Sequence, residues 1–323
     1  MSVRSITPII TACAVLAISA GGAHATYPER AIKVICTYVA GGGGDLMVRY
    51  YAHALGVAAG QPVIVENKAG ANGHLGNKAA MDAKPDGYTL LITGASAWVG
   101  NPLLMKDVDY DPLTALQPVT TLDELGLGLV VNPMLDIKSV TDLTSFIRGK
   151  AGKAKYAIQT SSALVAGNLY LQRIGAQAVG VNYKNSTDAV ADVAAGLLDY
   201  MFPDITLGLA QAKAGKVRLL AATPARKVTS APELPTMQDA GVPDFDYSVI
   251  WAAWFPAGTA EPIVQRMHDW LVEIVARPQT KTFLLSIGAD QRASASPEEM
   301  AQVIKAEYLK WKGIVQAAKI EKQ

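Results

Sequence analysis

The sequence predicts an α/β fold in which short strands and helices alternate along the chain. Runs rich in Val, Ile and aromatic residues recur, and helical stretches lie between most of them. Such alternation produces sheets with helical crossovers, so we expect mixed, mostly parallel sheets flanked by helices. The chain of 323 residues is also long enough for two domains of typical size.

Eight segments have the character of strands. They are Ile32–Tyr38, Val63–Glu66, Thr89–Thr93, Gln117–Thr121, Gly128–Val131, Ala154–Gln159, Tyr200–Phe202 and Arg218–Ala222. Because helical stretches separate most of these segments, neighbouring strands are expected to run parallel.

The C-terminal part of the chain is predicted to be helical. Its first apolar stripe has helical spacing and consists of Ile263, Met267, Trp270, Leu271 and Ile274. The run Ser296–Glu299 has the form of a capping box and opens a second helix. The stripe of that helix consists of Val303, Ile304, Trp311, Ile314 and Val315. We expect the aromatic residues of both helices to pack in the core or between domains.

The first 25 residues have the form of an export signal. Arg4 supplies a positive charge, Pro8–Ala20 is a short apolar core, and Ala23–Ala25 is a small-x-small cleavage site. We therefore expect cleavage after Ala25 and a soluble exported chain. A membrane anchor is one competing interpretation, but Ser, Thr, Pro and a Gly pair make a poor spanning helix. Lipid attachment at Cys13 is another, although the apolar core continues past that residue.

Cleavage would leave a chain without net charge. It removes Arg4 and no acidic residue, so the remaining chain has 28 basic and 28 acidic residues. A neutral surface gives no reason to expect nucleic acid or an acidic membrane as a partner. Cys36 becomes the single cysteine, so no intrachain disulfide can form, and we expect it to be a small buried apolar residue.

Four consecutive glycines lie between the first strand and a helical run that opens at Asp45. They are Gly41, Gly42, Gly43 and Gly44. A loop without side chains lets a ligand approach the backbone N–H groups, and the helix N-terminus adds a partial positive charge. This combination indicates a site for phosphate or carboxylate. The alternative is a tight turn that binds nothing, for which two glycines would be enough.

A dinucleotide site matches this junction only in part. The fingerprint G-x-G-x-x-G needs a third glycine, and the chain has Leu46 in that place, although Glu66 supplies an acid at the end of the second strand. Export would also remove the protein from the cytosolic supply of nicotinamide cofactor. We therefore expect no cofactor.

A secreted hydrolase that uses Ser96 is the enzyme alternative. The run Gly94–Trp98 is one glycine short of the nucleophile elbow G-x-S-x-G. None of the four histidines has metal-ligand spacing with another, so we expect no metal site.

Several segments carry a resemblance to a known family. Ala40–Asp45 is similar to the A-G-G-x-x-D loop of the Bug/TctC family, the periplasmic solute receptors of tripartite tricarboxylate transporters. Val65–Gly73 resembles that family's V-E-N-x-x-G-A-x-G segment, and Lys84–Leu90 resembles its P-D-G-Y-T-L turn. Further similarities follow in the family's order at Asn182–Lys184 and Leu234–Gly241.

The resemblance implies a two-lobed periplasmic binding protein of the type 2-like, venus-flytrap kind. Such a receptor captures a small carboxylate-bearing organic acid between its lobes and delivers it to membrane transporter subunits. It implies a periplasmic monomer without a cofactor, and not an enzyme. We expect residues 26–127 and 250–323 to form one lobe and residues 128–249 the other. A receptor that serves signalling instead of uptake would have the same sequence features.

The ligand site is expected beyond the carboxyl ends of the strands. In the first lobe it comprises Ala40, Gly41, Gly42, Gly43, Gly44, Asp45, Gly94, Ala95 and Ser96. In the second lobe it comprises Thr160, Ser161, Ser162, Tyr183, Lys184 and Asp204. The alternative for the hydroxyl and acidic residues is that they cap or stabilise helix N-termini.

The second lobe departs from the family's pattern. Ser161–Asn168 lacks the early glycine and the histidine that usually follow, and Asn182 and Asn185 stand where Pro and Gly are usual. The contacts of the first lobe therefore carry over more directly than those of the second. Leu164 and Val165 suggest the hypothesis of a less polar ligand body, either aromatic or aliphatic.

Overall fold

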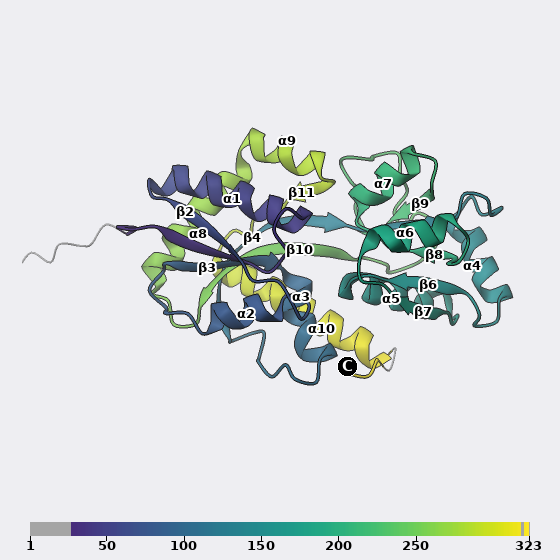
Figure 1. Ribbon diagram of the computed structural model, residues 1–323, viewed down its shortest axis with the longest axis horizontal. Helices are drawn as coiled ribbons and strands as arrows, with labels where there is room; N and C mark the ends of the chain where they lie inside the picture. The colour runs from purple at the N-terminus through teal and green to yellow at the C-terminus, as the bar shows by residue number, and fades with distance from the viewer. Residues whose placement is uncertain (1–26, 318–319, 323) are drawn as a thin grey trace, which may run out of the picture.

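The computed structural model describes residues 27–317 and 320–322, and it places two β-sheets side by side, each flanked by helices (Figure 1). The expected signal segment, residues 1–25, and Cys13 lie outside the described residues. Within the described part, no helix is both long and apolar enough to cross a membrane.

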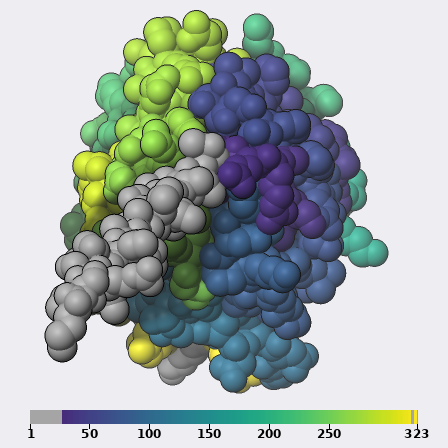
Figure 2. Space-filling view, turned by 90° about the vertical axis from the view of Figure 1, so that its left-hand side faces the viewer, coloured from purple at the N-terminus to yellow at the C-terminus, as the bar shows by residue number. Residues whose placement is uncertain are grey.

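The larger sheet has six strands in the order β11-β4-β10-β3-β1-β2. Its strands are β1 (Ile32–Cys36), β2 (Val63–Asn67), β3 (Thr89–Gly94), β4 (Leu116–Gly126), β10 (Ser248–Pro256) and β11 (Ala289–Gln291). Its helices are α1 (Gly43–Ala59), α2 (His74–Met81), α3 (Ala95–Leu104), α8 (Glu261–Ala276), α9 (Pro278–Ser286) and α10 (Pro297–Ala317). Figure 2 views the end of this lobe and shows the yellow-green C-terminal segment beside the purple and blue N-terminal one. The lobe is therefore built from both parts of the chain.

The smaller sheet has five strands in the order β7-β6-β8-β5-β9. They are β5 (Gly128–Val131), β6 (Lys155–Ile158), β7 (Val179–Asn182), β8 (Tyr200–Met201) and β9 (Arg218–Ala222). Helices α4 (Val140–Gly149), α5 (Ser161–Ile174), α6 (Ser186–Ala194) and α7 (Ile205–Lys213) complete this lobe.

Two crossings join the lobes at one end of a long strand pair. β4 passes through Leu127 into β5, and the segment 223–247 leads from β9 back into β10. β4 and β10 pair antiparallel, with Ser248 opposite Gly126 at the end where both crossings begin. The residue limits expected for the lobes stay a prediction, and β10 of the larger sheet already begins at Ser248.

The expected α/β fold with two mixed, helix-flanked sheets is confirmed, but parallel pairing does not dominate. Among the described strands, four pairs are parallel and five are antiparallel. The difference comes mainly from β10, which was not among the expected strands and pairs antiparallel with both β3 and β4. Its residues Val249–Pro256 are all buried, so the segment lacks the polar alternation that marks a half-exposed strand.

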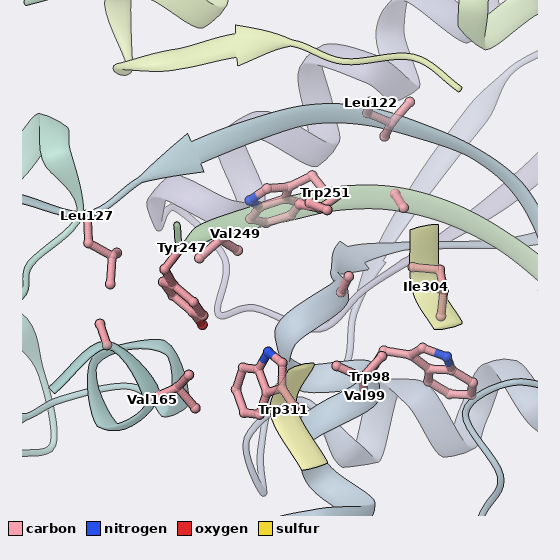
Figure 3. Packing of buried hydrophobic residues seen from close by; sticks show 14 of the residues in the cluster. Trp98, Val99, Leu122, Leu127, Val165, Tyr247, Val249, Trp251, Ile304 and Trp311 are labelled. Atoms are coloured by element: carbon pink, nitrogen blue, oxygen red, sulfur yellow. The ribbon is translucent and has the colours of Figure 1, made fainter. Parts of the chain in front are cut away.

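The C-terminal helices pack as expected. The N–H of Glu299 donates to the Ser296 hydroxyl at the start of α10, as the capping motif predicts. Trp311 is fully buried against α3, where a Cβ on Gly100 would lie only 2.4 Å from the indole ring (Figure 3). Gly100 therefore permits the close approach of these two helices. Cys36 is fully buried, as expected for a small apolar residue.

One acidic side chain lies inside the core of the larger lobe. Asp123 on β4 is fully buried and accepts a hydrogen bond from the Tyr51 hydroxyl at 3.1 Å, while its other oxygen has no partner in the described residues. Burial, with a smaller effect of the Glu124 charge, raises the pKa of Asp123 to about 8. The side chain is therefore mostly protonated in the folded protein at neutral pH.

We expect Asp123 to make the free energy of unfolding fall as the pH rises. Between its ordinary pKa of 3.8 and about 8, the folded state holds a proton that the unfolded state has lost. The stabilisation is complete below the lower value and is lost as the pH approaches the upper one. Relative to Asp123→Asn, the wild type should lose up to about 1.4 kcal/mol per pH unit.

Urea unfolding at pH 5, 6 and 7 checks this expectation. The matched control is Asp136→Asn, because the Asp136 side chain is 90% exposed and should follow the pH dependence of the wild type. Parallel pH profiles for the wild type and Asp123→Asn would contradict the assignment.

Candidate functional site

The glycine junction forms the start of α1. The helix begins at Gly43 with Gly42 as its N-cap, two residues before the expected opening at Asp45. Gly41 has a φ of +79°, which favours glycine. A Cβ on Gly41 or Gly43 would meet nothing within 4 Å, and both residues are exposed, as is Ala40 before them. The first turn of α1 is therefore open to an incoming group, as the anion-site hypothesis requires.

Gly44 is required for a different reason. A Cβ at this position would lie 2.5 Å from Cγ of Tyr38, which real side chains do not tolerate. The Tyr38 ring also stacks on Trp251 of β10, with ring centroids 5.0 Å apart. Tyr38 was not among the expected site residues, although it is held between the start of α1 and the central strand of the lobe.

Asp45 supports the loop from inside. It is 2% exposed, and one of its oxygens accepts hydrogen bonds of 2.8 Å from the Gly41 N–H and from Arg49. Its other oxygen accepts from the Asn67 amide at 2.7 Å. The hydrogen bond from Arg49, followed by those from Asn67 and Gly41, lowers the pKa of Asp45 to about 2. These contacts give the carboxylate a supporting role beneath the loop.

The second expected strand end lies beside the first. β1 and β3 are parallel neighbours, so their carboxyl ends share one edge of the sheet. Gly94 is the N-cap of α3, and a Cβ on it would lie 3.1 Å from the Tyr38 hydroxyl. Ala95 and Ser96 form the first turn of α3 and are buried. The starts of α1 and α3 therefore meet around Tyr38.

The second lobe contributes the start of α5. Thr160 is its N-cap, and its hydroxyl accepts from the Ala163 N–H at 3.1 Å, so capping accounts for this residue. The Ser161 hydroxyl accepts from Asn72 of the other lobe at 2.7 Å. Val165 is fully buried in the core, which leaves Leu164 as the one half-buried apolar residue of the hypothesis about the ligand body.

Asn72 is a contact between the lobes that sequence reasoning did not identify. It lies in the run Gly70–Gly73, whose four φ angles are all positive, from 45° to 130°. Its amide donates to Ser161 and also to Asn101 of α3, each at 2.7 Å. Such strained loops concentrate at functional sites. The available signal was the Asn72-Gly73 pair, since both residue types tolerate the left-handed region.

Tyr247 is a second residue that the sequence did not point to. It ends the crossing segment before β10 and is fully buried, with no hydrogen-bond partner for its hydroxyl in the described residues. Burial raises its pKa, and the nearby hydroxyls of Ser162 and Ser96, one from each lobe, lower it. Figure 3 shows this hydroxyl directed toward the indole nitrogen of Trp311, which also lacks a partner. Two donors without a hydrogen-bond partner in the described residues, the Tyr247 hydroxyl and the Trp311 indole N–H, therefore lie at the junction of the lobes.

Asp204 is the N-cap of α7, but its side chain makes no capping hydrogen bond. It is exposed to solvent, yet surrounding protein raises its pKa by desolvation. Its backbone pairs with Leu127, the residue through which β4 crosses to the smaller sheet. Asp204 therefore lies beside the junction of the lobes.

Tyr183 and Lys184 follow β7, at the edge of the smaller sheet. The Tyr183 hydroxyl donates to Asp192 of α6 at 2.5 Å, and Lys184 is exposed. β6 and β7 are parallel, so both residues share the sheet edge that carries Thr160. Their part in binding stays a prediction.

Ser96 lacks the surroundings of a nucleophile. It is 8% exposed, and no histidine or carboxylate of the described residues is hydrogen-bonded to it. Its hydroxyl neighbour is Tyr247, which cannot act as a base at neutral pH because burial raises its pKa.

Two surface hollows of the described residues lie away from these helix starts. One is lined by residues that follow β2 and by residues of α2, including Lys78, which forms an ion pair with Asp82. The other lies at the start of α4, beside Pro235 and Asp239. Neither hollow brings both lobes together, so the junction around Tyr38 and Tyr247 remains the candidate site.

Comparison with known proteins agrees with this architecture. Protein BugT of Bordetella pertussis is 32% identical over 295 residues, which are 90% of this chain and 90% of BugT. The solved structure of R. palustris Rpa4515 with adipate has a TM-score of 0.82 at 26% identity, covering 92% of this chain and all of that one. The periplasmic binding protein BugD gives a TM-score of 0.78 at 27% identity, with the same coverage.

The sequence profile described as the tripartite tricarboxylate transporter family receptor matches residues 47–320. This match extends over most of the chain and includes the motif at Val65–Gly73, whereas the glycine loop Ala40–Asp45 precedes it. The chain belongs to the tripartite tricarboxylate transporter receptor family, which consists of periplasmic solute-binding receptors and not of enzymes.

Proposed function

We propose that the protein is a periplasmic receptor that binds a small organic acid between its lobes and delivers it to a tripartite tricarboxylate-type membrane transporter. The main observation in support of this proposal is that helix starts from both lobes lie close together. α1 and α3 meet around Tyr38, and Asn72 of the larger lobe donates to Ser161 at the start of α5. Tyr247 lies near Ser96 and Ser162, at the starts of α3 and α5. In this proposal the lobes comprise residues 26–127 with 250–323, and residues 128–249.

A carboxylate fits the chemistry of these helix starts. Each N-terminus presents backbone N–H groups and a partial positive charge of about half an elementary unit. The expected site residues around them supply hydroxyl groups and glycine backbone, with Lys184 as the single basic side chain. Such a site would bind the acid by oriented dipoles and hydrogen bonds, as helix N-termini bind anions elsewhere.

The adipate bound to Rpa4515 supports the same ligand class. That protein has the same fold over 92% of this chain, and adipate is an aliphatic carboxylic acid. In our proposal the acid prefers the closed arrangement of the lobes and shifts the equilibrium toward it by that preference.

Organic acids should stabilise the chain that lacks residues 1–25. A ligand at about 100 times its dissociation constant adds about 2.7 kcal/mol to the free energy of unfolding. A thermal-shift panel of mono- and dicarboxylates measures this effect, and the matched control for each acid is its neutral amide. A carboxylate receptor would be refuted if the amides stabilised the chain as much as the acids do, or if none of the acids stabilised it.

A side chain on Gly43 should block the anion position of α1. A Cβ there meets no protein atom within 4 Å, so Gly43→Val should fold with a melting temperature close to that of the wild type. It should nevertheless lose the stabilisation by organic acids, because the valine occupies the space of the ligand. Gly149→Val at the end of α4 is the control, since Gly149 is equally open but lies at the end of a different helix. Retained ligand stabilisation in folded Gly43→Val would remove this loop from the site.

The contact between Asn72 and Ser161 should favour the closed form. Asn72→Gly keeps the left-handed backbone available while it removes the amide. Loss of the hydrogen bond between the lobes, worth about 0.5–1.5 kcal/mol, should weaken ligand binding roughly two- to tenfold. Calorimetry on Asn72→Gly, Ser161→Ala and the double variant forms a double-mutant cycle. Additive losses in the double variant would show that the two side chains are not coupled.

A further inference from the structure

The turn between α9 and β11 contacts the first turn of α7, across the boundary between the lobes (Figure 1). The Thr206 hydroxyl of α7 donates to the Ile287 carbonyl. A Cβ on Gly288 would lie 2.7 Å from the Thr206 hydroxyl oxygen and 2.8 Å from the Ile205 side chain. Gly288 therefore lets the backbone of the larger lobe lie directly on a helix of the smaller one.

This contact lies beside the crossings that join the lobes. β11 pairs with the end of β4, with Ala289 opposite Leu125, so Gly288 is close to the point where β4 leaves the larger sheet. The start of α7 is tied to the same point, because Asp204 forms a backbone bridge with Leu127. A contact so close to the crossings acts on the angle between the lobes.

Arg226 adds a group of ion pairs at the same place. It lies in the segment 223–247, where Val228 is buried against α7 and β9 of the smaller lobe. Its guanidinium group forms ion pairs with Glu124 of β4 and, at 3.2 Å, with Asp290 of β11. These two acids lie opposite each other, and their side chains are only 10% and 15% exposed. Arg226 therefore connects the crossing segment to two strands of the larger sheet, and such networks hold better than isolated surface pairs.

We propose that the α9–β11 turn and Arg226 form a hinge brace that fixes the angle between the two lobes. Domains of one chain move relative to each other unless an interface holds them. Here Gly288 lies on α7, the Thr206 hydroxyl bonds to the turn, and Arg226 ties the crossing segment to β4 and β11. The protein itself makes all of these contacts, so the inference depends neither on a ligand nor on the proposed function.

The test measures the distance between nitroxide labels on α9 and α7 by pulsed electron paramagnetic resonance. Thr282→Cys and Ala210→Cys carry the labels, because both positions are exposed on these helices. The chain lacking residues 1–25 is used, since it does not contain Cys13 and its Cys36 is fully buried from the label. With the hinge brace intact, we expect one narrow distribution of distances.

Gly288→Ala should broaden this distribution, because its Cβ does not fit against the first turn of α7. Loss of a contact equivalent to one hydrogen bond should raise the population outside the main distance about two- to tenfold. Gly60→Ala is the matched control. The φ angles of +69° at Gly288 and +65° at Gly60 give both variants the same backbone strain, but a Cβ on Gly60 meets nothing within 4 Å. Gly60→Ala should keep the wild-type distribution.

Arg226→Gln tests the hinge brace without backbone strain. It should also broaden the distribution, because it removes the charge that holds the crossing segment to β4 and β11. The variant should fold, since Glu124 keeps Arg292 as an ion-pair partner. Its control is Arg30→Gln, which removes an ion pair with Asp86 within the larger lobe and should leave the distances unchanged.

The outcomes decide the inference without a ligand. An unchanged distribution in either folded variant, Gly288→Ala or Arg226→Gln, would overturn the hinge brace. If Gly288→Ala does not fold, Arg226→Gln decides alone. A wild-type distribution as broad as that of the variants, or equal broadening in the controls, would overturn it as well. Each of these results leaves the proposed receptor function standing, because no organic acid is present in the measurement.

Discussion

The antiparallel pairing of β4 and β10 is the constraint on which the other features of the molecule depend. Gly126 and Ser248 face each other where that pair ends, so both crossings leave the larger sheet at one place. Leu127 and Tyr247 therefore lie next to this point by connectivity alone. β10 also contains Trp251, whose ring stacks on that of Tyr38. The lobe junction and the aromatic support of the site thus have a common origin.

The open glycine loop depends on a buried charge. Each glycine costs roughly 0.5–1 kcal/mol of conformational entropy on folding, so a run of four has little tendency to hold one shape. Asp45 compensates by accepting from the Gly41 N–H, Arg49 and Asn67, which fixes the loop to α1 and to β2. Arg49 also balances the negative charge of Asp45. An anion can therefore approach the exposed side of the loop although a carboxylate lies beneath it.

Sequence patterns predicted those features that are local along the chain. A strand, a glycine and a helix start are neighbours in sequence, and the junctions at Gly42, Gly94 and Thr160 were found in this way. Tyr38, Asn72 and Tyr247 could not be found, because their importance depends on which helices face them after folding. β10 was missed because periodicity alone does not distinguish a short apolar run from a segment of buried helix. The excess of antiparallel pairs follows from that one strand and its partners.

The four glycines differ in what requires them, and this explains why a tight turn alone does not account for the run. Gly41 supplies a left-handed residue, and Gly44 leaves room for the Tyr38 ring, so both are needed by the protein itself. Gly42 begins the helix as its N-cap, where a Cβ would approach the Val39 carbonyl oxygen to 3.3 Å. Gly43 alone has an ordinary φ and open space in front of it, so no contact within the described residues excludes a side chain there. The open space in front of Gly43 is where the proposed ligand would approach the first turn of α1.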